Sequence, residues 1–180
     1  MDTKTLCLGA LNRGAASGYE IKKAFEEGPL RHIHEASFGS IYPALTALSE
    51  EGLVVCTEMA QDKRPDKKVY SITDKGRAAL FEALMAPPAR DKVRSDFLFI
   101  MFFAQLLPPA RLAELIDQRI AWYRECLGRM ESCDPSGRPP GEIFVHGLGL
   151  AVYRAAAEYL AAHRDRLLDE VSAGARLVAE

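Results

Sequence analysis

Apolar positions in the first part of the chain recur at the three- and four-residue spacing of a helix. A stripe within residues 6–11 predicts a first helix, which Asn-Arg-Gly at 12–14 ends. Ser17 and Glu20 have the spacing of a capping box, in which each side chain binds the other residue's amide. They predict the start of a second helix, which Gly-Pro at 28–29 ends.

A third helix is predicted before Gly52, and its start is open. Its apolar positions are Ile41, Leu45 and Leu48, spaced by four and three residues. If Ser37 is the N-cap, Pro43 lies at the sixth helical position and removes a backbone hydrogen bond. If Ser40 is the N-cap, Pro43 lies in the first turn, where the amides have no helical partner. The sequence allows both starts.

Two β-prone runs follow, at residues 53–57 and 69–73. The segment between them, 60–68, is polar, so the three together predict a β-hairpin with a basic tip. The basic residues of the tip are Lys63, Arg64, Lys67 and Lys68. Thr73 then caps a fourth helical pattern.

The second half has helical patterns throughout, and Ala-Pro-Pro-Ala at 86–89 separates it from the first. We therefore expect one domain at 1–86 and another at 87–180. Residues 97–107 are apolar at ten of eleven positions, which predicts a helix buried on all sides. A long helix is predicted from about 142 to 171. Between them lies a coiled-coil-like seam: Ile116, Ile120, Tyr123, Leu127 and Met130.

These patterns predict a mainly α-helical protein with a small β-hairpin. Three helices and a hairpin, in that order, are typical of an N-terminal winged helix-turn-helix domain. The second half is expected to be a C-terminal helical dimerisation domain. One short three-helix region cannot cover the seam and the last helix while also burying 97–107, so we expect an obligate homodimer.

Composition and charge narrow the possible functions. The chain is 48% hydrophobic and 27% charged, with a net charge of −2, so no overall basic field draws it to nucleic acid or lipid. A DNA-binding surface would need basic residues gathered locally. The four cysteines show no CxxC spacing, and no secretory signal or bilayer-spanning run is present. We expect a reduced, cytoplasmic protein without a membrane partner.

A specific string around the third helix carries a family resemblance. It reads Ser37-Phe38-Gly39-Ser40-Ile41-Tyr42-Pro43-Ala44-Leu45, then Leu48, then Glu51-Gly52-Leu53-Val54. This string resembles the PadR family of transcriptional regulators, which Gly-Tyr-Glu-Ile at 18–21 and the second strand of the hairpin also match. The resemblance covers most of 1–86, while the second half is similar only in kind, to members with a long helical C-terminal domain. It implies a dimeric repressor, often released by a small molecule.

Candidate DNA contacts follow from the helix order, the charges and the resemblance. No lysine or arginine occurs between His32 and Asp62, so the third helix cannot use the common bidentate arginine–guanine contact. Hydroxyl groups would read the bases with little discrimination, and DNA shape would add specificity. The candidates are Ser37, Ser40, Tyr42, Thr46, Tyr19, Lys22, Lys63, Arg64, Lys67 and Lys68. The ordinary alternatives are solvated surface lysines and, for Tyr42, a half-buried core tyrosine.

Aromatic residues are dense in the second half, and they predict an effector site between subunits. The candidate effector residues are Phe99, Phe103, Trp122 and Tyr123, with Gln105, Arg119, Arg124 and His146 as polar anchors. The alternative is that these rings fill a dry, close-packed core.

Other chemistry has little support in the sequence. His32 and His34 could place two imidazoles on one side of an extended segment, but no acidic or cysteine partner has suitable spacing. Cys126 and Cys133 could share one side of a helix, although free cysteines are usually small buried apolar residues. No catalytic triad, nucleophile elbow or phosphate loop is visible. We therefore expect no catalytic residues, no metal and no cofactor.

The sequence thus predicts a sequence-specific DNA-binding transcriptional regulator. We expect a dimeric repressor that binds a palindromic operator in double-stranded DNA and is released by a small apolar or aromatic ligand. The alternative is a winged-helix module that binds a small molecule or docks to a protein without operator function.

Overall fold

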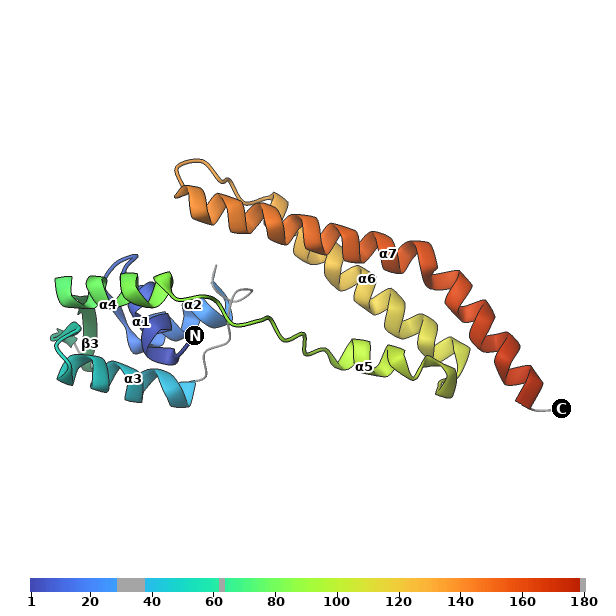
Figure 1. Cartoon of the computed structure of the whole chain (residues 1–180), viewed down its shortest axis with the longest axis horizontal. Helices are drawn as coiled ribbons and strands as arrows, with labels where there is room; N and C mark the ends of the chain where they lie inside the picture. Colours follow the sequence, from blue (N-terminus) through green and yellow to red (C-terminus); the bar gives the residue numbers. More distant parts are fainter. Residues whose placement is uncertain (29–37, 62–63, 179–180) are drawn as a thin grey trace. The chain divides into compact units, whose positions relative to one another are not determined.

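The computed structural model describes residues 1–28, 38–61 and 64–178, and the chain divides into two compact units. The N-terminal unit is Met1–Lys92 and the C-terminal unit is Val93–Glu180. Figure 1 shows that the first combines helices with a small sheet, whereas the second consists of helices.

The N-terminal unit has the element order of a winged helix-turn-helix domain, and this confirms the predicted fold class. Its elements are α1 (Thr3–Leu11), β1 (Ala16–Ser17), α2 (Gly18–Glu26), α3 (Phe38–Glu50), β2 (Val54–Gln61), β3 (Arg64–Ile72) and α4 (Asp74–Met85). The strands form one antiparallel sheet in the order β1-β3-β2. We call β2, β3 and the turn between them the wing. The sequence pattern did not predict β1, because a strand of two residues has no periodicity to detect.

One apolar core holds the first three helices against the sheet. Its largest fully buried side chains are Leu11, Ile21, Ile41, Leu45 and Leu48. Leu11, Ile41, Leu45 and Leu48 lie on the predicted helical stripes, and Val54 and Tyr70 extend the core to the wing. Burying a large apolar side chain contributes about 1.5–3 kcal/mol, so this core fixes the position of α3 against α2 and the sheet.

α3 begins at Phe38 and includes Pro43 within the helix. The later of the two predicted starts, with Ser40 as N-cap, is therefore wrong, and Ser37 lies outside the described residues. Gly52 ends the helix with a φ of 68°, where an L side chain would be strained. The Leu53 amide then donates to the Leu48 carbonyl at 2.8 Å, which is the closing bond of a Schellman motif.

The C-terminal unit is built on two long helices that lie side by side (Figure 1). Its elements are α5 (Asp96–Phe102), the 3-10 helix η1 (Ala104–Leu106), α6 (Pro109–Glu131) and α7 (Pro140–Val178). Its core includes Leu112, Ile116, Ile120, Leu160, Leu167 and Val171. Part of the predicted α6 seam, at Ile116 and Ile120, therefore packs within the chain. Arg164 of α7 also donates two hydrogen bonds of 2.7 Å to Asp117 of α6.

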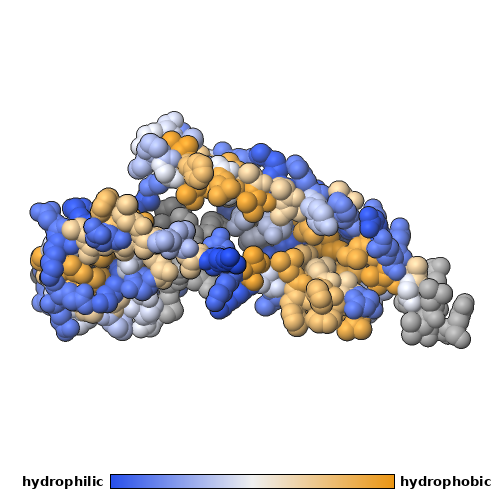
Figure 2. Space-filling model, viewed as in Figure 1, coloured by the Kyte–Doolittle hydropathy of each residue, from blue (hydrophilic) through white to orange (hydrophobic). Residues whose placement is uncertain are grey.

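Residues 97–107 differ from their prediction. α5 ends at Phe102 and a 3-10 turn follows, so the segment is not one helix. Phe97 is buried, but Phe99 is 69% and Phe102 78% exposed, so burial on all sides is wrong for the single chain. Figure 2 shows apolar side chains at the surface of this unit. Among the described residues, no helix is both long and apolar enough to cross a membrane.

Candidate nucleic-acid interface

α3 presents one face to the core and the other to solvent. Leu45 is fully buried, whereas Tyr42 is 40% exposed and Thr46 is exposed beside it. The Thr46 hydroxyl donates to the Tyr42 carbonyl at 3.2 Å, and Ser40, two residues before Tyr42, is half-buried. The described part of this face therefore offers hydroxyl groups and no positive charge, as the sequence indicated.

Tyr42 lies directly against the start of α2. A Cβ built on Gly18 would lie 2.8 Å from Cε1 of Tyr42 and 3.3 Å from Cδ1 of Leu45. Only glycine therefore allows the two helices to approach this closely. Tyr19 follows and is 61% exposed, so two of the predicted contact residues are accessible at this helix junction.

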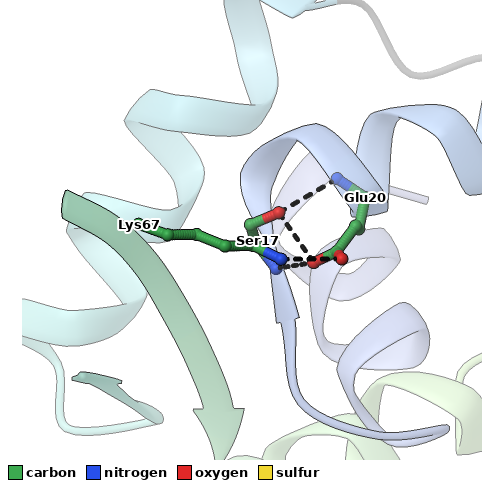
Figure 3. A network of polar contacts seen from close by, with 3 residues as sticks. All are labelled: Ser17, Glu20 and Lys67. Carbon is green, nitrogen blue, oxygen red and sulfur yellow. Dashed lines mark hydrogen bonds and ion pairs between the residues drawn. The ribbon is translucent and has the colours of Figure 1, made fainter. Parts of the chain in front are cut away.

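The first turn of α2 is also joined to the wing. Ser17 and Glu20 form the predicted capping box: the Ser17 amide donates to Oε2 of Glu20 at 2.8 Å, and the Glu20 amide donates to the Ser17 hydroxyl oxygen at 3.3 Å. The Ser17 hydroxyl in turn donates to the same Oε2 at 2.7 Å. On its other oxygen, Glu20 accepts a hydrogen bond of 2.8 Å from Nζ of Lys67 (Figure 3). One carboxylate thus links the helix cap to β3.

These contacts hold the Glu20 carboxylate in its charged form. The hydrogen bond from the Lys67 ammonium group, followed by those from Ser17, lowers the pKa of Glu20 to about 2. A carboxylate at this position also interacts favourably with the positive end of the α2 dipole. Glu20 is therefore ionised at any pH at which duplex DNA is handled.

The other described lysines at this surface also lie close to carboxylates. Lys22 is 3.3 Å from Glu26 on α2, and Lys68 is 3.6 Å from Glu58, its cross-strand partner in the wing. Lys63 lies outside the described residues, and of Arg64 only the backbone, at the start of β3, is described. From the sequence, these lysines were expected to be available charges. The Lys68–Glu58 pair could have been predicted from the register of the hairpin, in which the two residues face each other. The Lys67–Glu20 pair could not, because it joins residues 47 positions apart.

The effector candidates form two ring clusters in the C-terminal unit. Phe99 and Phe103 lie 5.3 Å apart between ring centroids on and just after α5. Trp122 and Tyr123 of α6 pack against Tyr153 of α7 at 5.6 and 5.5 Å. The guanidinium carbon of Arg119, a predicted polar anchor, lies 4.7 Å from the Phe97 ring centroid and 5.2 Å from that of Trp122. Tyr153 was not among the predicted effector residues.

The histidine and cysteine pairs considered in the sequence form no site among the described residues. His32 and His34 lie outside the described residues. Cys126 is buried and Cys133 exposed, and both are free thiols. Within the ranges the structure describes, no three histidine, cysteine or acidic side chains are grouped so that they could hold a metal ion.

Three helices, an antiparallel wing and an exposed polar face on α3 define the class of winged helix-turn-helix regulators. Residues 7–82 match the model of the Transcriptional regulator PadR-like family. Over this region, residues 7–82, the chain has the sequence of the PadR-like family of transcriptional regulators.

Similar proteins are found over most of the chain. The Negative transcriptional regulator PadR of Bacillus subtilis is 29% identical over 141 residues, covering 76% of this chain and 77% of that protein. The structure of the PadR-like regulator BC1756 from Bacillus cereus is 28% identical, with a TM-score of 0.78 over 94% of this chain and 99% of that one.

Two structures of Bacillus subtilis PadR share the fold at 24% identity. One, in complex with operator DNA, has a TM-score of 0.76 over 91% of this chain and 98% of that one. The other, in complex with p-coumaric acid, has a TM-score of 0.68 over 91% of this chain and 97% of that one.

Proposed function

We propose that this protein is a transcriptional repressor that binds a palindromic DNA operator as a homodimer and leaves it when an aromatic ligand binds. The observation that carries the proposal is the arrangement of α3. Its apolar face is fixed in the core, and its exposed face holds Tyr42 and Thr46 beside the start of α2. The proposal includes no catalytic step and no cofactor.

In this proposal α3 enters the major groove and the wing lies along the DNA backbone. Ser37, Ser40, Tyr42 and Thr46 supply hydroxyl contacts, and Tyr19, Lys22, Lys63, Arg64 and Lys68 supply phosphate contacts. Lys67, the remaining predicted DNA contact, is bound to Glu20 at 2.8 Å. Hydroxyl groups both donate and accept, so they discriminate weakly between bases. Sequence-dependent DNA shape would therefore supply part of the specificity.

The C-terminal unit would supply the dimer and the ligand site. Exposed apolar side chains on α5 and on the first half of α7 give the surface for a second copy. Bacillus subtilis PadR has been solved with p-coumaric acid, an aromatic carboxylic acid. The rings of Phe99, Phe103, Trp122 and Tyr123 suit a planar aromatic ligand, and Arg119 offers a positive group beside them.

Selection from a library of random duplexes, followed by sequencing, tests the DNA-binding part. We expect one enriched inverted repeat whose half-sites are centred about one helical turn, 34–36 Å, apart. Tyr42→Phe should weaken binding to that repeat, because it removes only the hydroxyl group. Recovery of no enriched sequence would contradict operator recognition.

Fluorescence of Trp122 tests the ligand part, because the chain has one tryptophan and its side chain is 40% exposed. We expect an aromatic acid to quench it and to weaken DNA binding by a factor of about 5 to 150, the usual range of allosteric coupling. An aromatic acid that quenches Trp122 without releasing the operator would show that ligand binding does not regulate DNA binding, and would contradict the ligand part of the proposal.

A further inference from the structure

Ion pairs in the N-terminal unit place a carboxylate beside each of the four lysines that the structure describes on α2 and β3. Three pairs are local: Lys22–Glu26 within α2, Lys23–Glu27 between α2 and its C-cap residue, and Lys68–Glu58 between paired strands. The fourth, Lys67–Glu20, is different, because it joins the wing to the first turn of a helix.

Strand pairing explains why Lys67 reaches Glu20. The last pair between β1 and β3 is Ser17 with Val69, because α2 begins at the next residue, Gly18. Lys67 is two positions before Val69 and therefore points to the same side of the sheet. Beyond the end of β1, the Lys67 side chain therefore joins β3 to the Glu20 carboxylate. Hydrogen bonds from Ser17 already orient this carboxylate (Figure 3).

We propose that Glu20 is a positioning residue that limits DNA affinity: by holding the Lys67 ammonium group, it withholds one positive charge from DNA phosphates and lowers affinity for DNA of any sequence. The inference rests on the proposed DNA-binding function. Non-specific binding is almost entirely electrostatic, whereas base readout uses the hydroxyls of α3. Withholding a charge therefore weakens binding to random-sequence DNA and to the operator alike.

The exposure of the pair limits what the pair itself adds to folding. The Lys67 and Glu20 side chains retain 35% and 49% of their exposure, and such solvated pairs contribute little to stability. The charge balance agrees with the proposed role, since residues 1–86 hold 11 basic and 12 acidic residues. One released lysine is thus a large change in the local field of this unit.

Glu20→Gln is the decisive variant, because glutamine keeps an oxygen for the Ser17 amide and loses the charge that holds Lys67. The probe is a random-sequence duplex of about 30 base pairs, titrated across a range of salt concentrations. We expect the slope of log affinity against log salt to steepen by about 0.9, one additional phosphate contact, and affinity at 0.15 M salt to rise about fivefold.

Two further variants separate this effect from simple alternatives. Glu82→Gln removes one carboxylate from an exposed position of α4, which packs on α1, and should leave the slope unchanged. Lys67→Gln should have little effect alone and should abolish the gain in Glu20→Gln. Thermal unfolding by circular dichroism checks that each variant is folded.

The possible results are distinct. An unchanged slope in folded Glu20→Gln would overturn the inference, because the released Lys67 would not meet DNA. A loss of affinity in both Glu20→Gln and Lys67→Gln would also overturn it and leave the pair a structural brace of the wing. If the wild-type protein bound neither random duplex nor any selected sequence, the proposed function itself would fail, and this inference with it.

Discussion

At the scale of single residues, Glu20 takes part in three interactions at once. It completes a helix cap, faces the positive end of α2 and binds Lys67 on the wing. The cap was evident from the spacing of Ser17 and Glu20, since capping depends only on local sequence. The bond to Lys67 was not, because it depends on how β3 pairs with β1.

The first residue-scale prediction concerns acid stability. The folded pKa of Glu20, about 2, lies below its ordinary value of 4.5, so the group stabilises the fold above pH 4.5. That contribution is lost as the pH falls from 4.5 toward 2. We expect Glu20→Gln to lose less stability than wild type between about pH 6 and pH 3 in urea unfolding. Glu82→Gln is the control, and equal acid sensitivity of Glu20→Gln and wild type would contradict the prediction.

The second concerns the four thiols. Burial raises the pKa of Cys7 to about 11. Cys126 is also buried, whereas Cys56 and Cys133 are exposed. Because the thiolate is the reactive form, we expect maleimide to label two cysteines in the folded protein and all four in denaturant. Mass spectrometry of the digested protein identifies the sites, and rapid native labelling of Cys7 would show that the core opens readily.

At the scale of elements, neighbouring positions of α3 have different roles: one stabilises the fold and the next is available to contact DNA. Leu45 is fully buried and Thr46 is exposed. We expect Leu45→Ala to lower the free energy of unfolding by about 2–5 kcal/mol, because it leaves a cavity in the core. Thr46→Ala should change stability by less than about 0.5 kcal/mol and weaken DNA binding.

Urea unfolding and DNA titration of both variants check this prediction. Each variant is the control for the other, because both place alanine on the same helix. A destabilised Thr46→Ala, or a Leu45→Ala as stable as wild type, would mean that the two faces of α3 are assigned wrongly.

Elements with strong periodicity were predictable from the sequence, and those without it were not. The spacing of Ile41, Leu45 and Leu48 gave α3 and its buried face, but β1 is too short to carry a pattern. The break after Phe102 was hidden because nearly every residue around it is apolar. In the proposed interface, the exposed hydroxyls of α3 could be predicted, whereas the contact of Tyr42 with Gly18 required the fold.

At the scale of the whole molecule, α7 is apolar on two sides. Ala157 and Val171 are buried and Leu160 packs in the core with α6. Phe144, Leu148, Val152 and Tyr159 lie on another face, spaced by four, four and seven residues, and are 54–73% exposed. A helix with two apolar sides in a folded chain indicates that a second surface covers one of them.

We expect Phe144→Glu to convert the homodimer to a monomer, because it places a charge within that exposed apolar face. Light scattering after size-exclusion chromatography measures the mass at micromolar concentration. Arg166→Glu, further along α7 and also exposed, is the control and should remain a dimer. A wild-type protein of monomer mass would contradict the proposed assembly.

The second apolar side of α7 also affects the chain before it finds a partner. A newly made copy exposes Phe144 and its neighbours from the moment it folds until it meets another copy. The rate of dimerisation is second order in protein concentration, so a monomer persists for a long time at the few copies per cell typical of a regulator. During that time, self-association in the wrong geometry competes with pairing. Synthesis of many chains from one message at one place would shorten the exposure, so clustered translation would favour correct assembly of this protein.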